Sequence, residues 1–160
     1  MNSDTTQKQL SEKDVIQVLH FIIEKIGTKD IIRRFDGGVN LLIRGMPRLP
    51  TDIDIRTNKA GYEAFNKEFL KMKKKEGQSK MRETLGKKQY SIFNIQGMDV
   101  EVAYYEKEIE CMDMFSDIIK KTRNGITIPV LPLAQIKHFY EWIGSTEKMK
   151  LIENFLSQNK

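Results

Sequence analysis

The chain has 160 residues and a formal net charge of +5, with 39% of its residues hydrophobic and 31% charged. This length and apolar fraction suit one hydrophobic core, so we expect a single domain over residues 1–160. No stretch approaches the roughly 20 consecutive apolar residues of a membrane span, and the polar opening MNSDTTQKQL lacks the apolar stretch of a secretory signal. We therefore expect a cytoplasmic protein with no membrane partner. The single cysteine, Cys111, cannot form an internal disulfide.

The first third of the chain predicts two helices and two strands. Residues 10–27 have a Ser-x-x-Asp start, apolar residues at spacings of three and four, and a final glycine, which together indicate an amphipathic helix. DIIRRF (30–35) is typical of a short strand that leads into two glycines. VNLLIR (39–44) favours a short helix ended by a glycine and a proline, and DIDIR (52–56) favours a second strand.

The next helix is predicted to begin after Asn58 as its cap and to continue to Gly77. Its apolar side would carry four large residues: Tyr62, Phe65, Phe69 and Met72. The basic segment KMKKKEGQSKMRETLGKK (71–88) then has two interpretations. It is either a solvated helix end and loop, because lysines are favoured near helix C-termini, or a surface for a polyanion such as nucleic acid or a nucleotide. It has no interleaved aromatic residues for base stacking, which favours the first interpretation.

The remaining residues predict hairpins and then helices. QYSIFNI (89–95) and MDVEVAY (98–104) flank a Gln-Gly pair and indicate a hairpin. DIIKKTRNGITIPVL (117–131) contains an Asn-Gly turn signal, although its first arm could equally be helical. Two amphipathic helices are expected over 132–158. The order of elements predicts an α+β domain in which a mixed sheet over 30–130 lies between an N-terminal helix and C-terminal helices.

Two aspartates of the second strand are the first candidates for a functional site. Successive strand side chains point to opposite faces, so Asp52 and Asp54 should lie on one face, about 6.6 Å apart along the backbone. Two like charges on one surface repel, and a bound cation is the simplest compensation. Carboxylate oxygens select hard ions such as Mg²⁺ or Mn²⁺, which serve phosphoryl chemistry.

A glycine pair lies directly upstream of these aspartates. Gly37 and Gly38 precede a predicted helix N-terminus, where free N–H groups and the positive dipole end suit phosphate oxygens. The stretch therefore combines anion binding with cation binding. A metal-chelated nucleoside triphosphate needs both.

The whole stretch FDGGVNLLIRGMPRLPTDIDI (35–55) resembles the signature of the nucleotidyltransferase superfamily that includes DNA polymerase beta. That signature is a strand ending in Gly-Gly or Gly-Ser, a short helix, and a strand bearing Asp-x-Asp. Among the branches, the chain looks most like small bacterial proteins related to lincosamide and aminoglycoside nucleotidyltransferases and to the nucleotidyltransferase toxins of abortive-infection systems. The resemblance spans residues 32 to about 156, and its specific motif lies within 35–55.

The resemblance implies roles for further residues. The third metal-binding carboxylate of the superfamily lies on a later strand between apolar residues, which points to Glu101, with Asp99 on the same face as the alternative. Many members have aspartate at this position, so a glutamate is a departure. Relatives also carry an arginine four residues before the first aspartate, where this chain has Arg48, and a lysine in a Pro-started helix, where it has Lys137. Both would bind the triphosphate, and Lys148 in the last helix could assist.

The sequence thus predicts a nucleotidyltransferase that moves a nucleoside monophosphate from a nucleoside triphosphate to an acceptor hydroxyl and releases pyrophosphate. Asp52, Asp54 and Glu101 would hold Mg²⁺ or Mn²⁺, and Glu101 would accept or orient the acceptor proton. The acceptor, whether a small molecule, RNA or protein, is not defined by the sequence. Two alternatives remain open: a nucleotide-binding module without turnover, and a toxin component that acts on RNA or protein.

Overall fold

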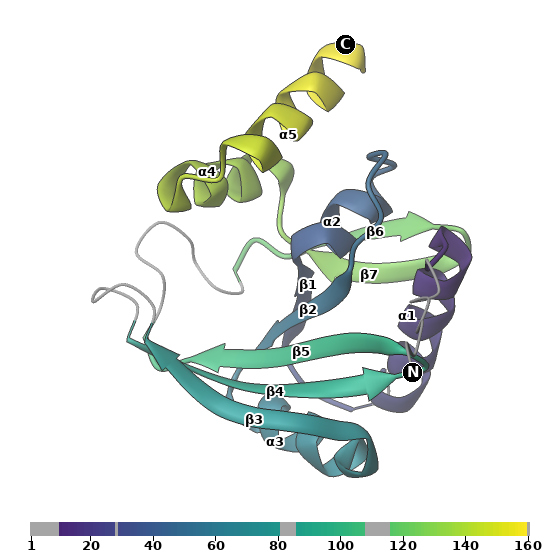
Figure 1. Ribbon diagram of the computed structural model, residues 1–160, viewed down its shortest axis with the longest axis vertical. Coiled ribbons are helices and arrows are strands. Elements are labelled where there is room, and N and C mark those ends of the chain that lie inside the picture. Colours follow the sequence, from purple (N-terminus) through teal and green to yellow (C-terminus); the bar gives the residue numbers. More distant parts are fainter. Residues whose placement is uncertain (1–9, 28, 81–85, 108–115, 160) are drawn as a thin grey trace, which may run out of the picture.

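The computed structural model describes residues 10–27, 29–80, 86–107 and 116–159, and Cys111 and residues 81–85 of the basic segment lie outside these ranges. Five α-helices, one short 3₁₀ helix and seven strands follow one another along the described residues (Figure 1). Their order is α1 (Glu12–Ile26), β1 (Arg33–Asp36), α2 (Gly37–Ile43), β2 (Asp52–Thr57), α3 (Lys59–Glu68), η1 (Leu70–Met72), β3 (Lys73–Lys80), β4 (Lys87–Ile95), β5 (Met98–Tyr105), β6 (Ile119–Arg123), β7 (Ile126–Val130), α4 (Leu133–Ile143) and α5 (Thr146–Gln158).

The seven strands form one mixed sheet in the order β3-β4-β5-β2-β1-β7-β6. β2 pairs in parallel with β5 and β1 in parallel with β7, whereas the other neighbours are antiparallel. The α+β class with a mixed sheet is therefore confirmed. β2 lies in the middle of this sheet, and β3 and β6 form its two edges.

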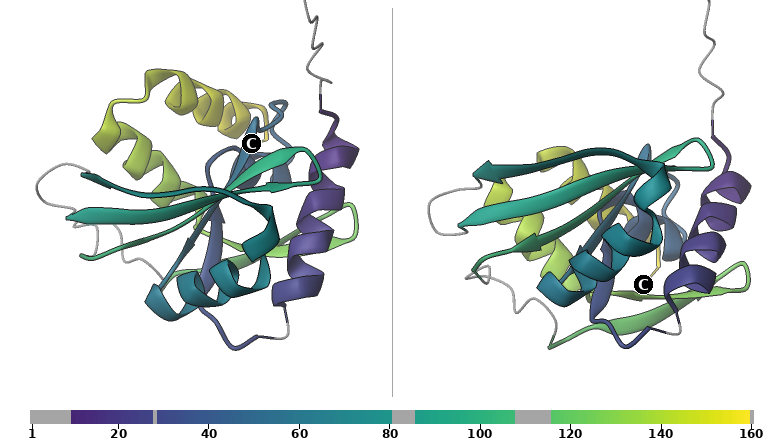
Figure 2. Two further views of the ribbon diagram at one scale, coloured as in Figure 1. Left: turned by 60° about the horizontal axis from the view of Figure 1, so that its bottom comes forward. Right: turned by 90° about the horizontal axis from the view of Figure 1, so that it is seen from below.

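Helices cover the sheet unequally. α1 and α3 lie against one face, while α4 and α5 stand at one end of the molecule beside α2 (Figure 2). The main hydrophobic core fills the space under α1 and α3, and a second apolar cluster packs α4 and α5 onto α2 through Leu41, Met46, Leu131, Ile136, Tyr140 and Ile152. No helix in the described ranges is both long enough and apolar enough to span a bilayer.

Local signals in the sequence explain where several elements begin and turn. Ser11 and Asp14 form a reciprocal capping box at the start of α1, and the Asn58 side chain accepts a hydrogen bond of 2.9 Å from the Gly61 N–H at the start of α3. The two predicted hairpins turn at Gln96-Gly97 and Asn124-Gly125, where all four residues have positive φ. The first arm of the second hairpin is strand β6, so its helical alternative is wrong.

The helix predicted to reach Gly77 ends earlier, because α3 stops at Glu68 and residues 73–80 form strand β3. The apolar periodicity continues only through η1, and β3 contains no apolar side chain that could continue a buried helix face. Gly77 lies opposite Tyr90, where a Cβ would come within 2.9 Å of the Tyr90 hydroxyl oxygen. The described part of segment 71–88 is thus mainly an edge strand and the start of β4, rather than a helix end and loop. Lysine is uncommon in strands, so the composition concealed this strand.

Candidate active site

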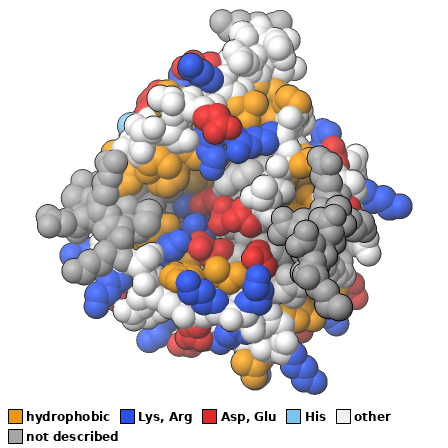
Figure 3. Space-filling model, viewed as in Figure 1, with side chains coloured by type: hydrophobic (Ala, Val, Ile, Leu, Met, Phe, Trp, Pro, Cys, Tyr) orange, Lys and Arg blue, Asp and Glu red, His pale blue; other side chains and the backbone are white. Residues whose placement is uncertain are grey.

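Carboxylates from three neighbouring strands meet on the sheet face that α1 and α3 leave free. In the strand register, Asp54 of β2 lies opposite Asp36 of β1 on one side and opposite Glu101 of β5 on the other. Asp52 lies opposite Asp99 of β5. Residues directly opposite on paired strands share a face, so the five side chains form one acidic cluster. Figure 3 shows acidic side chains gathered in a hollow near the middle of this face.

Burial of the alternate residues fixes the direction of these side chains. Ile53 and Ile55 of β2 are fully buried in the main core, which leaves Asp52 and Asp54 on the opposite face. β5 alternates in the same way around Glu101, with Val100 and Val102 in the core. The alternation predicted from the sequence is confirmed, and the register places Glu101, rather than Asp99, beside Asp54.

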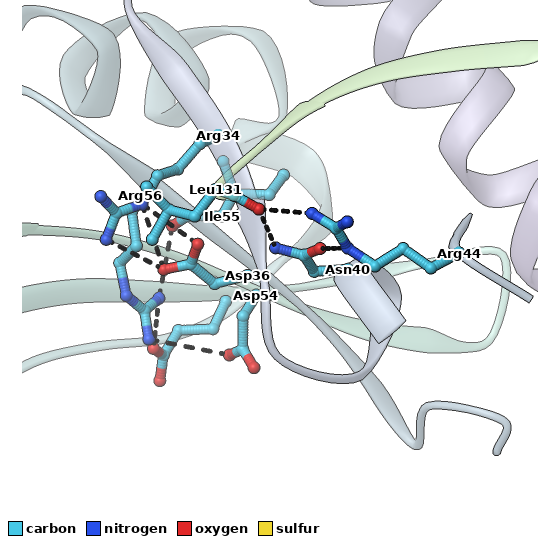
Figure 4. A network of polar contacts seen from close by, with 9 residues as sticks. Arg34, Asp36, Asn40, Arg44, Asp54, Ile55, Arg56 and Leu131 are labelled. Atoms are coloured by element: carbon cyan, nitrogen blue, oxygen red, sulfur yellow. Dashed lines mark hydrogen bonds and ion pairs between the residues drawn. The ribbon is translucent and has the colours of Figure 1, made fainter. Parts of the chain in front are cut away.

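Basic side chains compensate most of this negative charge. Arg34 is fully buried and its Nε lies 3.1 Å from Asp36 Oδ1. Arg56 places Nη1 3.0 Å from Glu101 Oε1 and Nη2 3.9 Å from Asp54 Oδ1 (Figure 4). Two lysines of the flanking strands contribute as well: Lys88 Nζ lies 2.9 Å from Glu101 Oε1, and Lys74 Nζ lies 2.8 Å from Asp99 Oδ1.

The electrostatic surroundings give Asp54 and Glu101 opposite properties. Burial raises the pKa of Asp54; Arg56 opposes this effect, and the charges of Asp52, Glu101 and Asp36 add to it. Burial also acts to raise the pKa of Glu101, but Arg56 and Lys88 together lower it below its usual range. The surroundings therefore stabilise the ionised form of Glu101, whereas they destabilise the ionised form of Asp54.

The glycine pair packs directly against β2. Gly37 has a φ of +59° and begins α2, and a Cβ at this position would lie 2.5 Å from Asp54 Oδ2. A Cβ on Gly38 would lie 2.8 Å from the Pro50 Cβ. Only glycine therefore allows the start of α2 to lie so close to the Asp54 carboxylate.

α4 and α5 close one side of the cluster. Tyr140 of α4 is buried, and burial followed by the charges of Asp36 and Asp54 raises the pKa of its hydroxyl. Asn40 of α2 and Arg44, the residue after its end, both donate hydrogen bonds to the Leu131 carbonyl oxygen just before α4, at 3.4 Å and 2.6 Å. These bonds tie the C-terminal helices to α2 (Figure 4).

The structure pairs the two predicted triphosphate-binding cations with glutamates of the C-terminal helices instead of with the acidic cluster. Arg48 Nη1 lies 2.6 Å from Glu147 Oε1 on α5. Lys137 Nζ lies 3.6 Å from Glu153 Oε1 and 3.9 Å from Glu141 Oε1. Lys148 lies over the Tyr140 ring, with its Nζ 4.9 Å from the ring centroid.

The acidic cluster suits a hard divalent cation by its donor chemistry. Its ligands are carboxylate oxygens, and the like charges around Asp54 leave negative charge that a cation would relieve. Asp52 is exposed and makes no ion pair with another described residue. However, no three acidic, histidine or cysteine side chains in the described ranges are already grouped as ligands of one ion. The donor types therefore fit Mg²⁺ or Mn²⁺.

Asp36 and Arg34 were not predicted from the sequence as members of this site, and Arg56 was not predicted to bind metal or nucleotide. A signal was present, because RFD in β1 mirrors DIR in β2: each strand carries an arginine and an aspartate separated by one apolar residue, in reverse order. Antiparallel pairing of the two strands aligns these sequences. Tyr140 had no such signal, because its place depends on how α4 packs.

Comparison with solved structures identifies a similar fold. The crystal structure of a Thermotoga maritima protein, named as a candidate nucleotidyltransferase (TM1012) and determined at 1.87 Å, superposes with a TM-score of 0.71 at 22% sequence identity. The alignment covers 96% of this chain and 99% of that one. No protein-family model matches the sequence, and no curated protein matches it. The chain therefore has a nucleotidyltransferase-like fold.

Proposed function

We propose that the protein is a metal-dependent nucleotidyltransferase that moves a nucleoside monophosphate from a nucleoside triphosphate to an acceptor hydroxyl. One observation carries the proposal: Asp52 and Asp54 share a face of β2, Glu101 of β5 lies opposite Asp54, and the backbone of Gly37 packs against Asp54. The fold shared with the Thermotoga maritima protein supports it. In the reaction, the acceptor oxygen forms a bond to the α-phosphorus, the bond to the bridging oxygen of the β-phosphate breaks, pyrophosphate leaves, and the hydroxyl proton passes to water.

The residues have distinct proposed roles. Asp52 and Asp54 would hold Mg²⁺ or Mn²⁺ and Glu101 would complete one metal site; the ion would supply charge neutralisation for the phosphates. The backbone N–H groups of Gly37 and Gly38 would donate to phosphate oxygens. Glu101 is better suited to orienting the acceptor hydroxyl than to accepting its proton, because a carboxylate with a lowered pKa is a weak base.

Arg48 and Lys137 would bind the triphosphate after leaving their glutamate partners. Both ion pairs are partly exposed, with side-chain exposures of 42% and 78% for Arg48 and Glu147 and of 34% and 53% for Lys137 and Glu153. Exposed ion pairs contribute about 0–1 kcal/mol, so a triphosphate can replace them at little cost.

A nucleotide-binding module without turnover is the second candidate. Two observations favour it: Glu101 Oε1 already contacts both Arg56 and Lys88, and no three metal ligands are grouped in the described ranges. A module of this kind would bind a triphosphate but transfer nothing from it.

Triphosphate with Mg²⁺ is expected to raise the melting temperature of the protein. A ligand that binds only the folded state adds about 2.7 kcal/mol at 100 times its Kd. For a chain of this size that corresponds to a rise of roughly 5–10 °C. Differential scanning fluorimetry with each of the four triphosphates measures it, with Mg²⁺ alone and triphosphate in EDTA as controls.

Transfer is then tested with α-labelled triphosphate, Mg²⁺ and extracts that contain small molecules, RNA and protein. Label recovered on an acceptor supports the enzyme and identifies the acceptor class. A thermal shift with no transferred label indicates the binding module. No shift with any base would contradict both.

A further inference from the structure

We propose that Arg56, together with Arg34, is a built-in counter-cation that holds the carboxylate cluster in position before any metal arrives. The metal-related part of this inference rests on the function proposed above, while the metal-free part rests on the contacts alone. Arg56 is accordingly a positioning residue that acts through Asp54 and Glu101.

The strand register places like charges side by side in two successive rows. Asp36 lies opposite Asp54, and in the next row on the same face Arg34 lies opposite Arg56. Like charges directly opposite each other on paired strands are destabilising. Here each row compensates the other, because each arginine lies two residues from an aspartate on its own strand and reaches back to it. Each row therefore offsets part of the repulsion within the other.

Arg56 links the row of aspartates to β5. Its side chain is only 11% exposed, and its guanidinium contacts Glu101 Oε1 at 3.0 Å and Asp54 Oδ1 at 3.9 Å. The guanidinium carbon lies 5.8 Å from the centroid of the Tyr105 ring, which screens it from solvent. A cation in this position needs carboxylate partners, and the carboxylates equally need the cation.

The same carboxylate oxygens are those that a metal would use. Arg56 therefore competes with a metal for charge at Asp54 and Glu101 while keeping both side chains on the correct face. Because Arg56 and Lys88 both contact Glu101, the cluster remains compensated in EDTA. The protein does not need metal to fold, and the ion is free to enter with the nucleotide.

The test is Arg56→Met, studied without nucleotide in EDTA and in Mn²⁺. In EDTA the variant should melt well below the wild type, because Asp54 and Glu101 lose their shared cation. Mn²⁺ alone should restore most of this loss and should bind roughly tenfold more tightly than to the wild type, because a competing positive charge has been removed. Titration followed by Mn²⁺ electron paramagnetic resonance measures the affinity.

Two variants serve as controls. Arg44→Met removes another half-buried arginine whose partners are neutral, the Asn40 side chain and the Leu131 carbonyl, so Mn²⁺ should not restore any stability that it loses. Arg56→Lys keeps the charge and should behave nearly as the wild type does in EDTA. If Arg56→Met does not fold in EDTA, Arg56→Met/Asp54→Asn should fold there, because the carboxylate that lost its ion-pair partner has also been removed, while Glu101 keeps Lys88.

An Arg56→Met protein that loses the same stability with and without Mn²⁺, as Arg44→Met does, would overturn the inference. That result leaves the transferase proposal standing if the wild type still binds triphosphate with Mg²⁺. Conversely, restoration by Mn²⁺ in a protein that never binds triphosphate would support the counter-cation and refute the transferase.

Discussion

Asp54→Asn is expected to lower nucleotide transfer by roughly 10²-fold or more, because a lost metal ligand removes several kcal/mol of transition-state stabilisation. The metal-free fold should remain as stable as the wild type or become more stable, because the substitution relieves repulsion from Asp52, Glu101 and Asp36. Denaturant midpoints in EDTA and transfer rates in Mg²⁺ measure the two effects. A purely structural Asp54 would give the reverse pattern, with a less stable variant that still binds metal-nucleotide normally.

The stability difference should also depend on pH. The pKa of Asp54 is raised in the folded state, so its ionised form costs stability at neutral pH, and this cost disappears as the pH falls through the folded pKa. In EDTA, the advantage of Asp54→Asn over the wild type should therefore be largest at neutral pH and should shrink on acidification. An advantage that grows on acidification would contradict the assigned shift.

Asp99→Asn is the matched comparison for the Asp54 substitution. Asp99 lies on the same face, opposite Asp52, but it is bound by Lys74 near the sheet edge. We expect a loss of transfer of less than about tenfold, because this carboxylate lies two residues along the strand from the position opposite Asp54 and contributes as an exposed ion pair. Equal losses for Asp99→Asn and Glu101→Gln would reopen the choice of the third carboxylate.

Gly37→Ala is expected to abolish triphosphate binding and to destabilise the fold by about 1–3 kcal/mol. The strain of a positive φ accounts for roughly 1–2 kcal/mol of that loss. The remaining effect is local, because the new Cβ would lie 2.5 Å from Asp54 Oδ2 and would push the carboxylate or the start of α2 out of place. Denaturant unfolding and the triphosphate-induced thermal shift provide the two readings.

Gly125→Ala is the control for Gly37→Ala, because it introduces the same backbone strain away from the candidate active site. Gly125 also has a positive φ of +76°, at the β6–β7 turn, and a Cβ there would meet nothing within 4 Å. It should lose similar stability while retaining the full thermal shift with triphosphate. If both variants lost triphosphate binding equally, the contact between Gly37 and Asp54 would not be the cause.

The elements that could be predicted from the sequence are those set by local chemistry. The capping box at Ser11, the Asn58 cap and the Gln96-Gly97 turn each depend on residues within a few positions of one another, and each is confirmed. Strand β3 could not be predicted, because its polar residues are stabilised by pairing with β4 and not by burial of their own side chains.

Which residues form the candidate site was only partly predictable, because that too depends on how distant strands pair. Alternation places Asp52 and Asp54 on one face from the sequence alone. The parallel pairing of β2 with β5 joins residues more than forty positions apart, and only this register distinguishes Glu101 from Asp99. The role of Arg56 likewise depends on two neighbouring strands at once.

Lysines on the two edge strands of the sheet have a second effect, on association between molecules. β3 and β6 are the outermost strands, and each carries consecutive basic residues: Lys73, Lys74 and Lys75 on β3, and Lys120 and Lys121 on β6. An edge strand has unpaired backbone groups on which another chain can add a strand, and lysines there disfavour such pairing. Many of the lysines that give the chain its net positive charge therefore lie on these two edges. There they protect the protein against edge-to-edge aggregation, whether or not they also bind a polyanion. Exchanging these lysines for apolar residues would remove that protection at both edges of the sheet.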